Sequence, residues 1–219
     1  MRLKTVSSRI SSTSTAHALY LSNSERQALY NLCTHKVALR NKTNFYIFDD
    51  LYSLFILSQF IGLIGGDRNT HHGGGVNYVC LPHTPKYDKY QDKWKVSGKM
   101  YGTEYEVSGF NPFKKNLHDH EAPCAVCYVQ SRGSTLMMPA RNDCPSGWTE
   151  EYHGYLMTEA YSNKKQRDYI CVDEDAEYVP GSQANKHGAS LYLVQGECYG
   201  LPCLPYVNYR ELTCAVCTK

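Results

Sequence analysis

The tetrapeptide CAVC occurs twice in this chain, as Cys124-Ala125-Val126-Cys127 and as Cys214-Ala215-Val216-Cys217. The two copies lie 90 positions apart (214 − 124), and two further matches follow in the same order. They are Tyr78-Val79-Cys80 with Tyr169-Ile170-Cys171, 91 positions on (169 − 78), and Tyr105-Glu106-Val107 with Tyr192-Leu193-Val194, 87 positions on (192 − 105). Ordered matches at nearly one spacing indicate an internal repeat, so the sequence predicts a tandem duplication.

The composition favours strands and turns over helices. The 219 residues include 19 tyrosines and 16 glycines, and tyrosine is enriched in strands while glycine marks turns. Short tyrosine- or valine-rich segments bounded by Gly, Pro, Asn or Asp read as strands. In the first repeat they cover residues 76–81, 92–108 (one or two strands) and 122–129, and in the second they cover residues 152–157, 167–172, 190–194 and 212–218.

These patterns predict a mainly β protein made of two small homologous subdomains. The first is expected over residues 51–133, with a degenerate start, and the second over residues 134–219. Residues 1–50 form an atypical segment in front of them. Residues 1–23 are rich in Ser and Thr and predicted to be disordered, while Ser24 and Gln27 form a capping box that predicts a helix.

The start of the chain conflicts with an oxidised second half. Residues 1–23 lack the apolar core of a signal peptide, and the apolar run Leu51–Ile64 is too short to span a bilayer. We therefore hypothesise that residues 1–50 are not the native start of a secreted chain. In a secreted protein the sequon Asn41-Lys42-Thr43 makes Asn41 a candidate for glycosylation.

Charge, motifs and histidines predict few kinds of chemistry. The net charge of +2 gives no footprint for nucleic acid. The chain has no Gly-x-Ser-x-Gly elbow, and Gly73–Gly75 lacks the ending of a phosphate loop, so we predict no enzyme, catalytic residue or cofactor. We also predict no metal site. Its only weak candidates are His118 and His120, which would share one face of a strand.

The cysteines predict disulfide bonds in an oxidising compartment. Eight of the ten cysteines lie between Cys124 and Cys217, at a density typical of secreted, cross-linked domains. Six of them fall in the second repeat and allow several pairings. The two Cys-x-x-Cys pairs could instead supply four thiolates to a structural zinc ion, but four cysteines of the second repeat would then stay unexplained.

The second repeat carries a specific order of motifs. They are Cys144-Pro145-Ser146-Gly147-Trp148, Gly154-Tyr155, Cys171, the close pair Cys198 and Cys203, and Arg210-Glu211-Leu212 before Cys214–Cys217. This order resembles one half of the non-collagenous C-terminal domain of type IV collagen, a family that is itself a tandem duplication. Asn77–Pro82 resembles the related globular domain of invertebrate short-chain, spongin-type collagens. The likeness covers about residues 60–219 and includes no Gly-X-Y repeat.

The resemblance implies a cysteine pairing. It implies the pairs Cys144–Cys217, Cys171–Cys214 and Cys198–Cys203, and by equivalence of the repeats Cys80–Cys124. Cys127 then lacks its counterpart, which leaves Cys33–Cys127 as a doubtful fifth pair.

The resemblance also implies a function. Domains of this family join chains in the extracellular matrix, so we expect oligomerisation with itself or related collagen-like chains into trimers or larger assemblies. The alternative is a secreted, lectin-like protein that recognises glycans or microbes.

Overall fold

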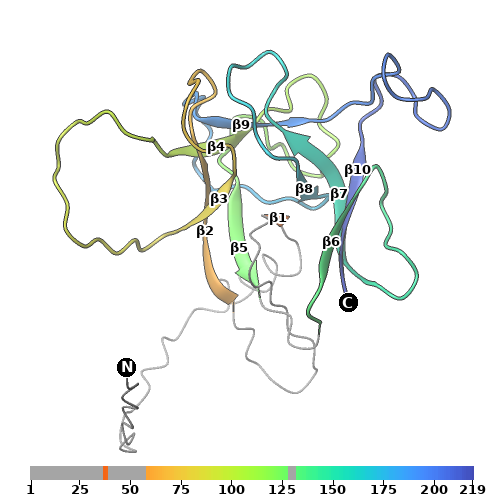
Figure 1. Cartoon of the computed structure of the whole chain (residues 1–219), viewed down its shortest axis with the longest axis horizontal. Helices are drawn as coiled ribbons and strands as arrows, with labels where there is room; N and C mark the ends of the chain where they lie inside the picture. The colour runs from red at the N-terminus through yellow and green to blue at the C-terminus, as the bar shows by residue number, and fades with distance from the viewer. Residues whose placement is uncertain (1–36, 39–57, 128–131) are drawn as a thin grey trace, which may run out of the picture.

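The computed structural model describes residues 37–38, 58–127 and 132–219, and this part of the chain is mainly β (Figure 1). It contains ten strands and no helix among the residues described. The strands are β1 (Val37–Ala38), β2 (Ser58–Gly66), β3 (Val79–Pro82), β4 (Tyr101–Tyr105), β5 (Pro123–Cys127), β6 (Thr135–Pro139), β7 (Thr149–Thr158), β8 (Ile170–Asp173), β9 (Ala189–Leu193) and β10 (Thr213–Thr218). The helix expected after Ser24 and the sequon at Asn41 lie outside the described residues.

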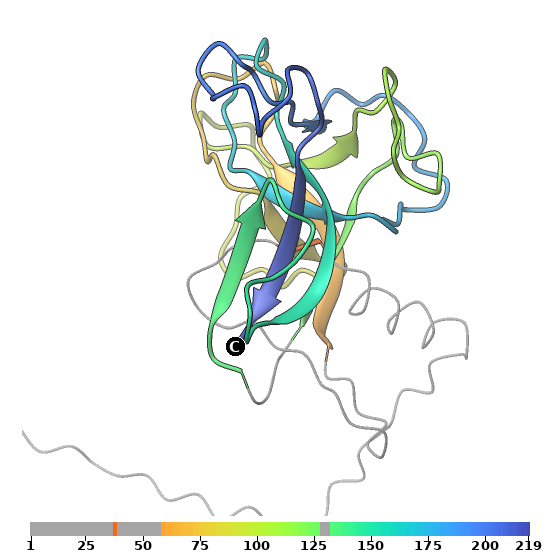
Figure 2. The ribbon, with the colours of Figure 1, turned by 90° about the vertical axis from the view of Figure 1, so that its right-hand side faces the viewer.

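The strands belong to one curled sheet. Its main path runs β1-β8-β7-β9-β4-β2-β3, with β5 on β2, β10 on β7 and β6 on β10. Figure 2 shows β6, β10 and β7 side by side. All ladders are antiparallel except the one between β4 and β9, which joins the first half of the chain to the second. The boundaries at residues 51–133 and 134–219 stay a prediction.

The pairing scheme of the first half recurs in the second. β2 pairs with β3, β4 and β5, and β7 pairs with β8, β9 and β10. The registers also agree. Gly62 lies opposite Cys124 and Gly154 opposite Cys214, while Ile64 lies opposite Cys80 and Leu156 opposite Cys171.

One of the three sequence matches has the wrong register. Gly66 lies opposite Tyr101 in the first half, and Thr158 lies opposite Tyr192 in the second. The ladders therefore place Tyr101, and not Tyr105, at the position that corresponds to Tyr192, an offset of 91 (192 − 101). The match at offset 87 arose because tyrosine recurs every few residues along this strand.

Two disulfides each cross over the central strand of one half. Cys80–Cys124 joins β3 to β5 across β2, with a Cα–Cα distance of 5.8 Å, and Cys171–Cys214 joins β8 to β10 across β7, with 5.6 Å. Strands on either side of a third lie roughly 9.6 Å apart in a flat sheet, twice the usual spacing. The sheet must therefore curl strongly at both crossings.

The remaining bridges lie in the second half. Cys144 pairs with Cys217, and Cys198 pairs with Cys203 within a loop. Together with the two crossing bridges, these are the four pairs that the family resemblance implies. The doubtful pair Cys33–Cys127 lies outside the described side chains.

The strand expectations for the second half are confirmed, and the one for residues 92–108 is confirmed only over β4. β7, β8, β9 and β10 overlap the four segments predicted there. In the segment 92–108, by contrast, only β4 is a strand. Residues 83–100 form a loop in which the side chains of Trp94 and Val96 are 82% and 93% exposed. Alternating apolar residues make a strand only where a sheet edge and a core receive them, and this loop projects away from both (Figure 1).

The close approach at each crossing requires glycine in the central strand. A Cβ added to Gly154 would lie 2.0 Å from the carbonyl oxygen of Val172, and one added to Gly62 would lie 1.7 Å from that of Leu81. We expect Gly154→Ala to lower the free energy of unfolding by about 2 kcal/mol, the usual scale of overpacking. Urea unfolding measures it against Gly109→Ala, where nothing lies within 4 Å. Equal stability of the two variants would contradict the constraint.

Candidate functional site

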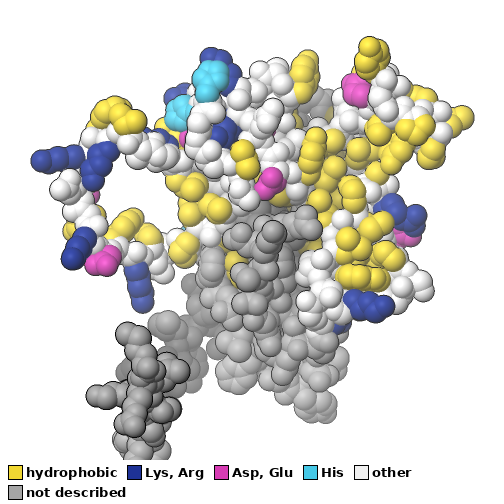
Figure 3. Space-filling model, viewed as in Figure 1, with side chains coloured by type: hydrophobic (Ala, Val, Ile, Leu, Met, Phe, Trp, Pro, Cys, Tyr) yellow, Lys and Arg dark blue, Asp and Glu magenta, His cyan; other side chains and the backbone are white. Residues whose placement is uncertain are grey.

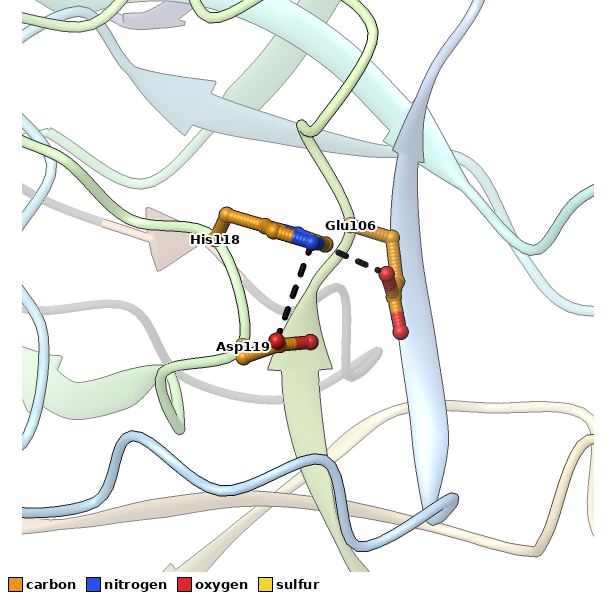
Figure 4. Close-up of side chains that lie close together, drawn as sticks. All are labelled: Glu106, His118 and Asp119. Carbon is orange, nitrogen blue, oxygen red and sulfur yellow. Dashed lines mark ion pairs between the residues drawn. The ribbon is translucent and has the colours of Figure 1, made fainter.

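A turn beyond β4 brings together Glu106, His118 and Asp119 (Figure 4). Nδ1 of His118 lies 3.6 Å from Oε2 of Glu106, and Nε2 lies 3.7 Å from Oδ2 of Asp119. One potential ligand atom from each residue falls within 4.8 Å of the others. Within the described ranges this is the one group of three His, Cys, Asp or Glu side chains that meets that distance. We call Glu106, His118 and Asp119 the ligand trio.

Backbone hydrogen bonds fix the trio to β4. The N–H of Tyr105 donates to His120 O (3.0 Å), and the N–H of Asp119 donates back to Tyr105 O (2.9 Å). The turn closes on itself through His120 N–H to Leu117 O (3.0 Å). Because Tyr105 and Leu117 are both fully buried, the turn is held by the core. Asp119 occupies the left-handed region, at φ 62°, which Asp tolerates better than most residues.

His120 does not join the trio. Its ring packs on that of Tyr178, with a centroid distance of 4.2 Å, and its Nδ1 lies 3.0 Å from the carbonyl oxygen of His118. The expectation that His118 and His120 share a strand face is wrong, because the segment is a turn around Asp119. The alternation that places i and i+2 on one face holds only in extended backbone.

Several carboxylates influence one another at the trio, and each makes ionisation of the others less favourable. Burial raises the pKa of Glu106, and Asp119, Glu104 and Glu159 raise it further, while His118 acts in the opposite direction. Burial likewise raises the pKa of Glu104, again with a contribution from Asp119. The site is therefore rich in negative charge that nearby side chains only partly balance.

Two polar atoms of the trio are buried without a hydrogen-bond partner, Nδ1 of His118 and Oδ1 of Asp119. A buried polar atom without a partner costs free energy, and native structures rarely retain one without a reason. Imidazole nitrogen and carboxylate oxygen are both ligands of divalent metal ions. Cation binding is the chemistry that this set of donors suits best.

Sequence reasoning finds one member of the trio and misses the others. His118 is a candidate from the sequence, but Glu106 lies 12 positions earlier (118 − 106) and no spacing links the two. A comparison of the two halves of the sequence could have pointed to Asp119, because the halves differ at this position. At offset 90 the second half has Asn208 and Tyr209 in place of His118 and Asp119, so the corresponding turn forms with other side chains.

No protein-family model matches this chain, and no solved structure matches it. In the described part of the chain, no helix has the length and apolar character needed to cross a membrane.

The raised pKa of Glu106 gives a pH dependence. Folded Glu106 holds its proton more tightly than the unfolded chain does, so the native state binds more protons between the two pKa values and stability falls as pH rises through them. Glu106→Gln removes this loss. In chelator-treated protein the variant should be more stable than the parent at neutral pH, and the difference should shrink below the unfolded pKa.

Urea unfolding at several pH values measures this difference. The matched control is Glu197→Gln, since Glu197 occupies the corresponding position of the second half (106 + 91) and is exposed. A pH-independent difference between parent and Glu106→Gln would show that burial of this carboxylate has no such cost.

Proposed function

We propose that this protein is an extracellular assembly module built from two tandem copies of one β unit, similar to the non-collagenous C-terminal domain of collagens. It joins further copies of itself or related collagen-like chains into trimers or larger assemblies in the matrix. The observation that carries the proposal is the shared register of the two halves, each with a disulfide across a glycine of its central strand. Four disulfides in the described chain support a secreted location.

The ends of the two central strands give further support to the duplication. Asp67 follows β2 and Glu159 follows β7, and each carboxylate accepts a hydrogen bond from the next backbone N–H. Each also contacts the side chain four residues on, His71 at 2.8 Å and Asn163 at 2.7 Å. The same local arrangement at corresponding positions of the two halves favours a common origin.

Exposed edges and apolar side chains support association. Among the described strands, β3 pairs only with β2 and β6 only with β10, and open edges can receive a strand from a partner. Figure 3 shows hydrophobic side chains gathered over the loop after β9. Its exposed apolar residues are Tyr199, Leu201, Leu204, Val207 and Tyr209. A gathered group of exposed apolar side chains is typical of an interaction surface.

Substitutions in the loop after β9 should dissociate the assembly into single chains. We expect the parent protein to sediment as a trimer or larger species in non-reducing buffer, and Tyr199→Ser with Val207→Ser to shift it toward monomer. Tyr161→Ser is the control, because Tyr161 is equally exposed on a different turn. A monomeric parent protein would overturn the assembly proposal, and unchanged assembly of the double variant would exclude this loop as the interface.

Glycan recognition is the second candidate, favoured by the loop 83–100. Tyr87, Tyr90 and Trp94 are exposed on it, the two tyrosine rings lie 6.3 Å apart, and Lys99 Nζ lies 5.7 Å from the centre of the Trp94 ring. The loop carries five lysines and two aspartates, so its charge suits acidic glycans. A loop of this length without secondary structure is uncommon unless it has a function.

Tyr90→Ala with Trp94→Ala should weaken binding to sulfated glycans several-fold, because each aromatic ring supplies a face that can stack on a sugar. Elution from a heparin column with increasing salt measures the effect, with Tyr161→Ala as the control. A parent protein that passes through the column and binds nothing on a glycan array would exclude the lectin-like function.

A further inference from the structure

The geometry of the ligand trio differs from that of an ordinary histidine ion pair in the same chain. His153 also lies between two carboxylates, but its Nδ1 is 2.8 Å from Glu150 and its Nε2 is 3.4 Å from Glu174. The contact with Glu150 is a hydrogen bond, and it raises the pKa of His153. His118 is further from both of its carboxylates, at 3.6 and 3.7 Å, and its Nδ1 is buried without a hydrogen-bond partner.

The second half shows that the turn does not need these side chains in order to fold. Tyr209, at φ 61°, takes the left-handed place of Asp119, and its N–H donates to Gly196 O as that of Asp119 donates to Tyr105 O. Arg210 N–H to Val207 O and Gly196 N–H to Arg210 O repeat the other two hydrogen bonds. The amide of Asn208 stands where the first half has the imidazole of His118. The turn keeps its backbone without the trio, so a local role beyond folding accounts better for the trio.

We propose that Glu106, His118 and Asp119 bind a divalent transition-metal ion, with Zn²⁺ as the best match. One imidazole and two carboxylates are zinc ligands, and with three protein ligands a tetrahedral ion keeps one position for water or a further group. Ca²⁺ fits less well, because it takes six or more oxygen ligands and imidazole supplies none.

The distances leave room for such an ion. With metal–ligand bonds of about 2.1 Å, the ligand atoms of a tetrahedral site lie roughly 3.4 Å apart. The ligand atoms of the trio lie within 4.8 Å of one another, so they would move closer together around an ion. The two carboxylates face different ring nitrogens, so binding one ion requires a shift of these partly buried side chains.

A bound cation would also reduce the electrostatic repulsion at the site. Glu106 and Asp119 repel each other electrostatically, and the positive charge of an ion would offset this repulsion. It would also coordinate Nδ1 of His118 or Oδ1 of Asp119, two buried atoms that make no hydrogen bond. It would also add a second link between the end of β4 and the turn, beside the hydrogen bonds of Tyr105.

Zinc titration of the full chain tests the proposal. The protein is stripped with chelator and kept in non-reducing buffer, so that the eight cysteines of the four described disulfides release no thiolate, and is then titrated with Zn²⁺ against a chromophoric chelator. We expect one tight equivalent for the parent protein, and roughly 10-fold or greater weakening for His118→Ala. The same equivalent should raise the unfolding temperature of the parent protein and not that of His118→Ala.

Asp119→Asn is the sharper variant. Asn tolerates the left-handed backbone as Asp does, so the variant removes a ligand charge and keeps the turn. It should lose the tight equivalent with its four disulfides intact. His153→Ala is the matched control and should keep the tight equivalent, because the His153 side chain is already hydrogen-bonded to Glu150. No tight equivalent in the parent protein, equal affinity in Asp119→Asn, or displacement of Zn²⁺ by an equal concentration of Ca²⁺ would each overturn the proposal.

Discussion

The architecture depends on a disulfide that crosses the middle strand of three, with one of its cysteines opposite a glycine of that strand. Cys80–Cys124 and Cys171–Cys214 hold their outer strands at Cα–Cα distances of 5.8 and 5.6 Å, well below the spacing of a flat sheet. A side chain at Gly62 or Gly154 would clash with the backbone of the neighbouring strand, so the two glycines are part of the same constraint. The disulfide, the glycine and the curl of the sheet occur together, and they do so in both halves of the chain.

The curl brings the two halves into contact through β4 and β9. Beside this parallel ladder, the Tyr78 hydroxyl donates to Ser190 O at 2.6 Å, and the guanidinium of Arg167 lies over the Tyr78 ring at 5.1 Å. Arg167 is paired with Glu159 at 3.2 Å, and both side chains are buried. A buried ion pair contributes little net stability, but breaking it is costly, so Glu159 holds Arg167 in the position from which it contacts Tyr78 of the first half.

Much of the fold could be predicted from the sequence, because cysteines and turn residues act locally or through a repeat. The mainly β character and the strands of the second half followed from short alternating segments bounded by turns. The loop around Trp94 could not be predicted, since alternation does not reveal whether a partner strand exists. Glu106 could not be found either, because its contact with His118 depends on hydrogen bonds of Tyr105 to a distant turn.

The two halves carry different side chains at corresponding turns after β4 and β9. After β4, Glu106 leads through a loop to the turn of His118 and Asp119, and after β9, Glu197 leads through a loop to the turn of Asn208 and Tyr209. In the second half the Cys198–Cys203 bridge ties this loop. In the first half the described loop has no disulfide, and the ligand trio stands at its two ends. A metal ion there would fasten the first loop by coordination where the second is fastened by a covalent bond, so each copy of the scaffold would have its own cross-link.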